Sequence, residues 1–344
     1  MKIVVTGGAG FIGSNFARHV LATHPGDEVV VFDKLTYAGN LDNLRELAAD
    51  PRYAFVRGDI CDAVAVAGVA AGADAVVNFA AETHVDRSIS GPEDFIRTDV
   101  LGTHVLLEAL RASGTARYLQ VSTDEVYGDV GSGSSRESDP LRPSSPYSAS
   151  KAAADLMVLA YRRTFGSPVL ITRSSNNYGP YQYPEKLVPL FITNLLEGEP
   201  LPVYGDGRNV RDWLYVEDNC RAIDLVLREG LDGEVYNIGG GEEVANIDLT
   251  RALLRALGQG DEMIHWVSDR AGHDRRYSVD CSRVRALGWA PQVPFAEGLA
   301  RTVAWYRDHH AWWEKIKSGD WQRYYAQQYG ALAGPGSRGT GTPG

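Results

Sequence analysis

The stretch VTGGAGFIGSN, residues 5–15, decides the fold that we expect for this chain. It joins an apolar run at 2–6, which predicts a strand, to a helical pattern at 12–22. Its three spaced glycines are Gly7, Gly10 and Gly13. Glycine allows a tight turn and lets backbone N–H groups approach a pyrophosphate where a helix begins. By itself this spacing describes only a strand–helix turn, so the surrounding sequence must decide whether it also binds a dinucleotide.

An acidic residue at the end of the second predicted strand favours the dinucleotide. Asp33 follows the apolar run at 28–32 and lies 20 residues after Gly13. A carboxylate there can accept hydrogen bonds from an adenosine ribose, and it repels a 2′-phosphate. Asp59 ends the third predicted strand, where it can meet the adenine amino group. The sequence therefore predicts a site for NAD rather than NADP.

Strands and helices alternate through the first half of the chain. The predicted strands lie at 2–6, 28–32, 54–59, 73–81, 117–122 and 168–175, and the predicted helices at 12–22, about 99–113 and from Pro146 onward. Short β-rich runs separated by helices indicate an α/β fold with a Rossmann-type, doubly wound parallel sheet. The strands are apolar almost throughout, which is typical of strands covered on both faces.

The amino-acid composition changes after about residue 180, where Pro and Tyr become frequent. We expect residues 1–180 to form the NAD-binding domain and residues 181–315 a smaller, mixed substrate lobe. The helices predicted in this second half lie at 186–197, 217–229, 247–257 and 295–307. The run EVYNIG at 234–239 reads as a strand, so a segment near 210–240 is expected to return to the sheet. Residues 330–344 lack apolar periodicity and predict a disordered tail.

Composition excludes several classes of protein. The net charge is −10 and no long Lys/Arg run exists, which argues against nucleic-acid binding. The three cysteines are widely spaced, and His309 and His310 have no neighbouring metal ligands, so neither a disulfide framework nor a metal site is expected. The chain shows no signal peptide and no apolar run of about 18 residues. These features together predict a cytoplasmic protein.

A tyrosine and a lysine four residues apart point to redox chemistry. In SPYSASKAAADL, Tyr147 and Lys151 share one face of the helix that begins near Pro146. A phenol has a pKa of about 10 and is a poor base at neutral pH. A nearby ammonium and an oxidised nicotinamide would favour the phenolate, so that Tyr147 could take a proton from a sugar hydroxyl. We therefore expect the pKa of Tyr147 to be lowered.

The glycine loop followed by Tyr-x-x-x-Lys resembles the extended short-chain dehydrogenase/reductase family, and the resemblance covers residues 1 to about 315. In that family a Ser or Thr ahead of the tyrosine holds the substrate hydroxyl, and Thr123 occupies this place. Epimerases, dehydratases, decarboxylases and reductases all share these motifs. The subclass must therefore come from other residues.

Two adjacent carboxylates, Asp124 and Glu125 in QVSTDEVYGD at 120–129, indicate the subclass. An epimerase needs only to remove and return one hydride, and similar epimerases carry small neutral residues here. Oxidation of a hexose at C4 makes the C5 proton acidic, so a base and an acid can then eliminate water across C5 and C6, after which hydride returns to C6. Two neighbouring carboxyls suit this, because repulsion and burial split their pKa values. The resemblance to nucleotide-sugar 4,6-dehydratases makes Asp124 the acid and Glu125 the base, which the sequence alone does not assign.

Further motifs resemble the dTDP-glucose 4,6-dehydratases within that family, which implies NAD as cofactor, dTDP-glucose as substrate and a homodimer. The cofactor residues implied are Gly7, Gly10, Phe11, Ile12, Gly13, Asp33, Lys34, Leu35, Thr36, Asp59, Ile60, Phe79, Ala80, Ala81, Thr98, Tyr147, Lys151 and Asn177. The substrate residues implied are Thr83, Thr123, Asn176, Lys186, Leu187, Pro202, Val203, Tyr204, Arg211, Asn246, Arg270, His273 and Asp274. Most relatives have Ser at the position of Thr83, and the hydroxyl is kept.

Three alternatives stay open at the level of sequence. One is a dehydratase for UDP- or GDP-hexoses, because Pro and Tyr packing does not distinguish thymine from uracil. Another is a nucleotide-sugar 4-epimerase. The third, a non-catalytic NAD-binding protein, would be expected to lack Tyr147, Lys151 or the carboxylates, and all of these are present.

Overall fold

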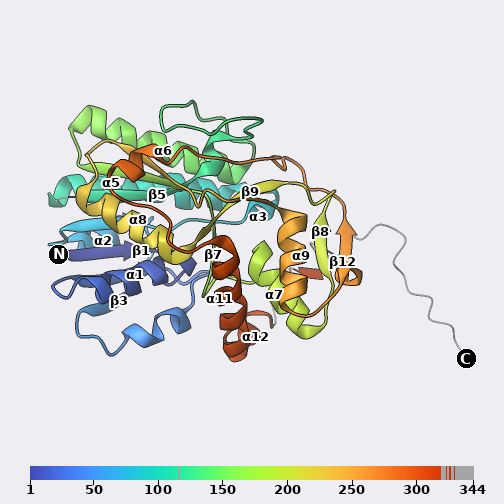
Figure 1. Cartoon of the computed structure of the whole chain (residues 1–344). Coiled ribbons are helices and arrows are strands. Elements are labelled where there is room, and N and C mark those ends of the chain that lie inside the picture. Colours follow the sequence, from blue (N-terminus) through green and yellow to red (C-terminus); the bar gives the residue numbers. More distant parts are fainter. Residues whose placement is uncertain (115–116, 319–322, 324, 327–328, 330–344) are drawn as a thin grey trace, which may run out of the picture.

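The structure is a computed structural model that describes residues 1–114, 117–318, 323, 325, 326 and 329 (Figure 1). Its central element is a seven-stranded parallel sheet in the order β10-β6-β5-β4-β1-β2-β3. The strands are β1 (Lys2–Thr6), β2 (Glu28–Asp33), β3 (Tyr53–Arg57), β4 (Ala75–Asn78), β5 (Arg117–Thr123), β6 (Val169–Ser174) and β10 (Val235–Ile238). The predicted doubly wound α/β fold is confirmed. The tail predicted at 330–344 lies outside the described residues.

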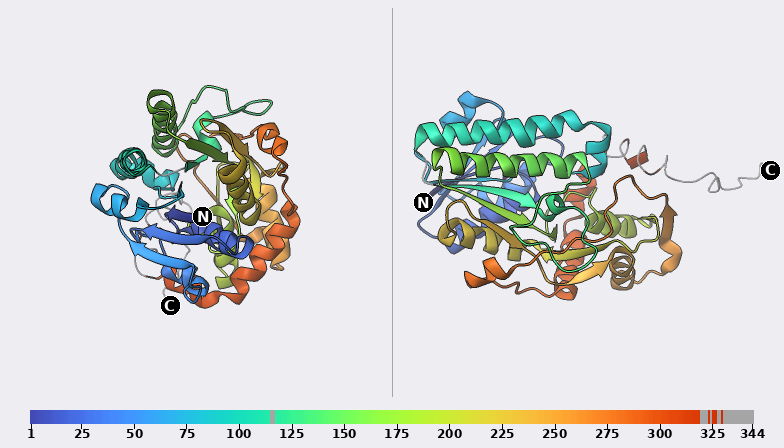
Figure 2. Two further views of the ribbon diagram at one scale, coloured as in Figure 1. Left: turned by 90° about the vertical axis from the view of Figure 1, so that its left-hand side faces the viewer. Right: turned by 90° about the horizontal axis from the view of Figure 1, so that it is seen from above.

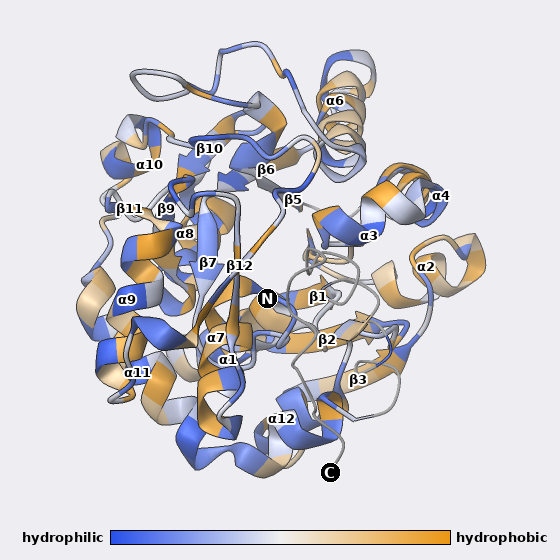
Figure 3. Cartoon of the chain, turned by 90° about the vertical axis from the view of Figure 1, so that its right-hand side faces the viewer, coloured by the Kyte–Doolittle hydropathy of each residue, from blue (hydrophilic) through white to orange (hydrophobic). Residues whose placement is uncertain are grey.

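Both faces of this sheet are buried, which explains its apolar strands. In β1, Ile3 and Val5 enter one hydrophobic core and Val4 enters another on the opposite face. This alternation follows from the two-residue period of a strand. Figure 3 shows β1, β2 and β3 mostly in the hydrophobic colour.

Helices cover the two faces of the sheet in two groups. One group consists of α1 (Phe11–Thr23) and α8 (Val216–Glu229), which pack against each other. The other consists of α2 (Ala63–Ala70), α5 (Gly102–Ser113) and α6 (Pro146–Phe165). Figure 2 shows α5 and α6 lying side by side along one side of the molecule.

The helix predicted at 99–113 begins earlier than expected. The helical path runs from α3 (Val85–Ser90) and α4 (Pro92–Phe95) through the π-helical stretch η2 (Ile96–Leu101) into α5. Helix α4 has a favourable start that the prediction did not use. Pro92 lies in its first turn and is followed there by Glu93 and Asp94.

A second unit lies beyond the carboxyl ends of the sheet strands. Its helices are α7 (Leu187–Glu197), α9 (Asn246–Ala256), α11 (Phe295–Asp308) and α12 (His310–Ile316). They enclose a separate core that includes Phe191, Leu253, Tyr306 and Trp313. The remaining short helical segments are η1 (Leu41–Leu47), η3 (Asp124–Tyr127), η4 (Asp261–Met263) and α10 (Ser282–Ala286).

Two small sheets in the second half were not predicted. One joins β7 (Asn176–Tyr178), β9 (Val210–Tyr215) and β11 (Glu243–Ala245), and the other joins β8 (Leu201–Tyr204) to β12 (Ile264–Val267). Four of these five strands have only three or four residues, which is too short to show a period in the sequence, and the pairing partners are distant along the chain.

The chain crosses back to the large sheet in its second half. α8 packs on α1, and β10 pairs in parallel with β6 at the edge of the sheet. The division into residues 1–180 and 181–315 stays a prediction, which the two separate cores support. Among the described residues, no helix has the length and apolar character needed to cross a bilayer.

Candidate active site

The glycine loop forms the turn between β1 and α1. Gly7 has a φ of +65°, and a Cβ there would lie 2.5 Å from the backbone nitrogen of Ala80. A Cβ on Gly13 would lie 2.6 Å from the carbonyl oxygen of Gly7. Both positions therefore require glycine. The N-cap of α1 is Gly10, which has no side chain to satisfy the first N–H groups of the helix, so they are available to an anion.

Asp33 is held in place at the end of β2. Its carboxylate accepts hydrogen bonds from the N–H groups of Ala9 (2.9 Å) and Leu35 (2.7 Å). Burial raises the pKa of Asp33, and these two hydrogen bonds partly oppose the shift. The neighbouring Lys34 forms an ion pair of 2.8 Å with Asp59. The two carboxylates expected at the adenosine end are thus fixed by the backbone and by one lysine.

A large cavity lies above the carboxyl ends of β1, β2, β4, β5 and β6. It is lined by all five predicted catalytic residues and by every predicted cofactor residue except Leu35. The Leu35 backbone has a φ of +60° and its N–H serves Asp33, so its role in the structure is to shape the loop. The cavity is also lined by Glu82, Tyr183 and Glu185, which the sequence interpretation missed. Glu82 and Glu185 lie directly beside the predicted residues Thr83 and Lys186.

Tyr147 and Lys151 are presented by the first turns of α6. Ser145 and Ser148 form a capping box that fixes this helix start. The Lys151 ammonium is buried and donates a hydrogen bond of 2.8 Å to the carbonyl oxygen of Val121 on β5. The spacing of four places both side chains on the face of α6 that lines the cavity.

The protein surroundings of Tyr147 do not lower its pKa, so the predicted lowering would have to come from the nicotinamide charge. Burial raises the pKa of the phenol well above its usual value, and the carboxylates of Glu125 and Asp99 raise it further. A hydrogen bond with Thr123 opposes these effects without outweighing them.

Asp124 and Glu125 lie in η3, directly after β5, and their surroundings differ. Asp124 is buried, and its pKa is raised well above the usual range by burial and by the carboxylates of Glu125 and Asp212. Burial also raises the pKa of Glu125, but three cations (Arg270, Lys186 and Arg211) lower it. Asp124 is therefore the member of the pair that holds its proton more strongly.

A second cavity opens beside the first, and Glu125, Asn176, Glu185 and Lys186 line both. The predicted substrate residues that line this second cavity are Asn176, Lys186, Leu187, Pro202, Val203, Tyr204, Arg211, Asn246, Arg270 and His273. Thr83 and Thr123 line the first cavity instead. The residues that the sequence interpretation missed here include His84, Asp86 and Tyr329.

Asp274 lines neither cavity. Its carbonyl oxygen accepts a hydrogen bond of 2.9 Å from Arg211, and its carboxylate accepts one of 2.7 Å from Tyr277. Asp274 therefore supports the Arg211 guanidinium, which lies 4.3 Å from the centre of the Tyr277 ring. The structure places it behind the cavity wall rather than in it.

Arg270 and His273 lie at the edge of the second cavity on the loop after β12. Arg270 forms an ion pair of 3.4 Å with Asp86, which also accepts a hydrogen bond of 3.3 Å from the Tyr204 hydroxyl. His273 shares a hydrogen bond of 2.6 Å with Asp269, and burial lowers the pKa of its imidazole. These groups form a basic and aromatic wall.

Several buried polar atoms of the two cavities have no protein partner among the described residues. They are Asp124 Oδ2, Asn176 Oδ1, Asn177 Oδ1, Asn246 Oδ1 and Arg270 Nε. An unpaired buried polar atom costs about 1–3 kcal/mol, and such atoms are rare in folded proteins. Their concentration in one place indicates that the cavities are built for polar ligands, as a dinucleotide and a nucleotide-sugar both are.

Comparison with known proteins agrees with this geometry. A family model described as GDP-mannose 4,6 dehydratase matches residues 4–302. The chain is 55% identical to a dTDP-glucose 4,6-dehydratase of Streptomyces niveus over 325 residues, which are 93% of this chain and 97% of the relative.

Comparison with solved structures finds proteins of the same name. A dTDP-glucose 4,6-dehydratase of Streptomyces venezuelae, crystallised with NAD and a second ligand, is 56% identical with a TM-score of 0.91, and the match covers 92% of this chain and 100% of that one. The enzyme of Bacillus anthracis in complex with NAD is 47% identical with a TM-score of 0.87, over 92% of this chain and 100% of that one. The chain therefore belongs to the family that the GDP-mannose 4,6 dehydratase model describes, as a relative of its dTDP-glucose 4,6-dehydratases.

Proposed function

We propose that the protein is an NAD-dependent dTDP-glucose 4,6-dehydratase, a hydro-lyase that makes dTDP-4-keto-6-deoxyglucose for deoxysugar biosynthesis. The observation that carries the proposal is the pair Asp124 and Glu125, one surrounded by carboxylates and the other by cations, beside Tyr147 and Lys151. This arrangement supplies an acid and a base next to a redox site. The similarity to proteins of that name supports the choice of nucleotide.

The first cavity fits NAD. The open N–H groups at the start of α1 suit its pyrophosphate, Asp33 suits the adenosine ribose, and the unpaired Asn177 Oδ1 can accept a hydrogen bond from the carboxamide end. When bound, NAD supplies the two-electron oxidant for the sugar C4, takes part in restoring C6, and brings the positive charge that favours the Tyr147 phenolate.

Tyr147 and Thr123 act at C4. The Thr123 hydroxyl positions the C4 hydroxyl, and the Tyr147 phenolate takes its proton as the ketone forms. Because the surroundings of Tyr147 raise its pKa, the phenol holds a proton strongly once it has received one. Lys151, fixed on the Val121 carbonyl, keeps a positive charge near the phenolate.

Glu125 and Asp124 then eliminate water. The ketone at C4 acidifies the C5 proton, which Glu125 removes as the ionised base that Arg270, Lys186 and Arg211 favour. Asp124, kept protonated by burial and by its acidic neighbours, gives its proton to the departing C6 oxygen. The C6 hydroxyl leaves as water, and a proton returns to C5 when C6 is restored.

The second cavity suits the nucleoside diphosphate. Arg211 and Arg270 present guanidinium donors, and Arg270 Nε is buried without a protein partner. Guanidinium groups bind diphosphate oxygens well. Tyr204 and Pro202 offer flat apolar surface for a base.

Purified protein incubated separately with dTDP-glucose, UDP-glucose and GDP-mannose tests the proposal by mass spectrometry. Loss of one water from dTDP-glucose, without net reduction of added NAD, is the expected result. Water loss from only the UDP- or GDP-sugar would assign another nucleotide, and a product of unchanged mass but altered C4 configuration would identify an epimerase.

We also propose that the protein is a homodimer that pairs through α5 and α6. The two helices lie side by side (Figure 2). Helix α6 and the segments before α5 carry large apolar side chains that are exposed in one chain. The side chains are Ile89, Ile96, Leu101, Leu156 and Phe165, between 43% and 60% exposed. Such a concentration of exposed apolar residues is typical of an interface.

The same proposal places the enzyme in the cytoplasm. Its three cysteines are free thiols, and Cys220 and Cys281 are buried in the core. Unpaired cysteines are usual in a reducing compartment.

A further inference from the structure

A buried ion pair joins β6 to α6 close to the catalytic residues. The Nε of Arg173 donates a hydrogen bond of 2.9 Å to the carboxylate of Asp155. Arg173 is 2% exposed and Asp155 is fully buried. Two charges taken out of water lose their hydration, and such a pair often stabilises a fold no more than apolar residues of the same size would. The position of the pair therefore points to a role other than stability.

Arg173 also contacts the segment that carries the two carboxylates. Its Nη1 donates a hydrogen bond of 2.7 Å to the hydroxyl of Tyr127, the last residue of η3. That hydroxyl donates in turn to the side-chain oxygen of Asn237 on β10, at 2.8 Å. In the large sheet Arg173 pairs with Ser122 of β5 and with Asn237, so the register of the strands sets where it lies. Arg173 is thus bonded both to α6 and to η3.

The segment η3 is short and needs anchoring from outside. It has four residues, Asp124–Tyr127, and ends at Gly128, whose φ is +77°. So short a helix has little stability of its own, and contacts with the rest of the fold must hold it. A 3-10 helix has three residues per turn, so Tyr127 follows Asp124 by one turn on the same side. An anchor at Tyr127 therefore fixes the direction in which Asp124 and Glu125 are presented.

The helix that carries the redox pair has anchors of its own. Lys151 donates to the carbonyl oxygen of Val121, and a capping box fixes the start of α6. The Ser150 hydroxyl donates a hydrogen bond of 2.6 Å to Asp99. Asp155 follows Lys151 by four residues and so lies on the same face of α6. Arg173 consequently connects η3 to a helix that is already fixed.

We propose that Arg173, with Asp155 and Tyr127, is a positioning residue that fixes the acid–base pair of η3 relative to the redox pair of α6. This inference rests on the proposed dehydratase function and adds to it three residues that line neither cavity. They act through the carboxylates of η3, because a displacement of about 1 Å in a reacting group can cost roughly 100-fold in rate.

Tyr127→Phe tests the proposal, because it removes the hydroxyl that joins η3 to Arg173 and keeps both the ring and the buried ion pair. Single-turnover stopped-flow absorbance follows NADH, which forms when C4 is oxidised and disappears after water is lost. NADH should form at the wild-type rate and disappear roughly 10- to 100-fold more slowly. With dTDP-glucose deuterated at C5, the isotope effect on kcat should exceed that of the wild type, since removal of the C5 proton has become slower.

A second variant and a control complete the test. Arg173→Lys keeps the positive charge beside Asp155 but loses the planar fork that reaches two partners, so it should show the same pattern. Tyr161→Phe is the matched control. Tyr161 is 7% exposed against 5% for Tyr127, and its hydroxyl also has two polar partners, on the same side of the sheet but away from η3. It should show wild-type kinetics, and all variants should bind dTDP with the wild-type Kd.

Wild-type decay of NADH in Tyr127→Phe would overturn the proposal. Equal slowing of NADH formation and decay would also overturn it, because the hydroxyl would then have a general structural role. A wild type that releases no water from dTDP-glucose would overturn the proposed function, and this inference with it. A wild type that releases water, beside a Tyr127→Phe variant whose steps are normal or evenly slowed, would overturn this inference alone.

Discussion

Asp124 and Glu125 are chemically similar side chains that neighbouring charges make different. Burial raises the pKa of both, but carboxylates raise that of Asp124 further while cations oppose the shift at Glu125, so Asp124 holds its proton more strongly. The cations come from Lys186, Arg211 and Arg270, which the fold brings to the end of β5 from the second unit. A pair that is ambiguous in the sequence thus acquires two distinct roles in the structure.

Replacement of the proposed base gives the first prediction. Glu125→Gln keeps the size of the side chain but removes the carboxylate that takes the C5 proton. Release of water from dTDP-glucose should fall by roughly 100- to 10,000-fold, the range that one general base contributes. Mass spectrometry of the product over time measures this.

Glu262→Gln is the matched control, because Glu262 is an exposed glutamate of η4. It should retain the wild-type rate. A wild-type rate in Glu125→Gln would show that another group removes the C5 proton.

At the scale of elements, the β1–α1 turn is tightly constrained by its own backbone. A Cβ on Gly13 would meet backbone atoms of Gly7 and Gly8 at 2.6 Å and 2.8 Å, and backbone cannot move aside as a flexible side chain can. Gly13→Ala should therefore weaken NAD binding roughly 10-fold or more and destabilise the fold by about 1–3 kcal/mol. Calorimetric titration with NAD and urea unfolding measure the two effects.

Gly26→Ala provides the comparison, since a Cβ there has no atom within 4 Å and its φ is not in the left-handed region. It should bind NAD normally and unfold at the wild-type urea concentration. If the two alanine variants behaved alike, close backbone approach at Gly13 would not be the reason for glycine there.

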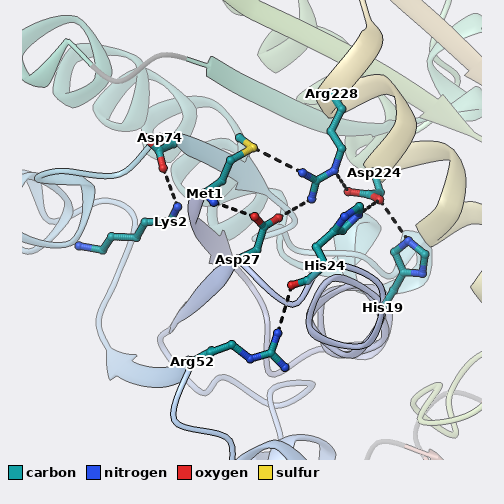
Figure 4. Close-up of polar contacts among 9 residues, drawn as sticks. All are labelled: Met1, Lys2, His19, His24, Asp27, Arg52, Asp74, Asp224 and Arg228. Carbon is teal, nitrogen blue, oxygen red and sulfur yellow. Dashed lines mark hydrogen bonds and ion pairs between the residues drawn. The ribbon is translucent and has the colours of Figure 1, made fainter.

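A network of charges joins β1, α1 and α8 on the side of the sheet away from the cavities (Figure 4). The amino terminus of Met1 and Arg228 both bind Asp27, at 2.7 Å and 2.6 Å. Arg228 also binds Asp224 at 2.8 Å, and two histidines, His19 and His24, converge on the same carboxylate. Hydrogen bonds and ion pairs thus connect the amino terminus and α1 with α8, some 200 residues along the chain.

The network makes the fold less stable as the pH falls through the acid range. Burial would raise the pKa of Asp224, but hydrogen bonds with His19, His24 and Arg228 lower it to about 2. Because the folded pKa lies below the unfolded value of about 3.9, the stabilisation is complete above pH 4 and is lost as the pH falls towards 2. Asp224→Asn should reduce the free energy of unfolding at pH 7 by roughly 1–2 kcal/mol.

Urea unfolding between pH 7 and pH 3 checks this dependence. The difference between wild type and Asp224→Asn should shrink towards pH 3, whereas Glu229→Gln, an exposed change on the same helix, should match the wild type throughout. A difference that stays constant over this range would mean that the carboxylate charge is not its source.

At the scale of the whole molecule, the exposed apolar side chains on α6 and on the segments before α5 need an explanation. Leu156→Glu places a charge at a side chain that is 57% exposed in one chain. Burying that charge in a dimer would be unfavourable, so sedimentation velocity should show monomers where the wild type shows dimers. Val64→Glu changes a residue that is 84% exposed on α2 and should leave the dimer intact. A wild type that sediments as a monomer would contradict the proposed interface.

Part of the site was predictable because its motifs consist of nearby residues. The glycine loop, Tyr147 with Lys151, and Asp124 with Glu125 can each be recognised within about a dozen positions. Glu82 and Glu185 were missed although they lie beside predicted residues, because no local pattern shows that they line a cavity. Leu35 and Asp274 were placed in the site by resemblance, but neither lines a cavity, and each contacts a residue that does.

The sequence by itself determined the doubly wound sheet and the chemistry of its loops, because strand periods, helix starts and glycine turns are properties of consecutive residues. Only the tertiary structure decided the direction of each pKa shift in the site, the small sheets of the second unit and the presence of Tyr329 in the second cavity. These depend on distances between residues far apart in the chain. Electrostatic interaction and burial follow distance in space, and position along the sequence does not determine them.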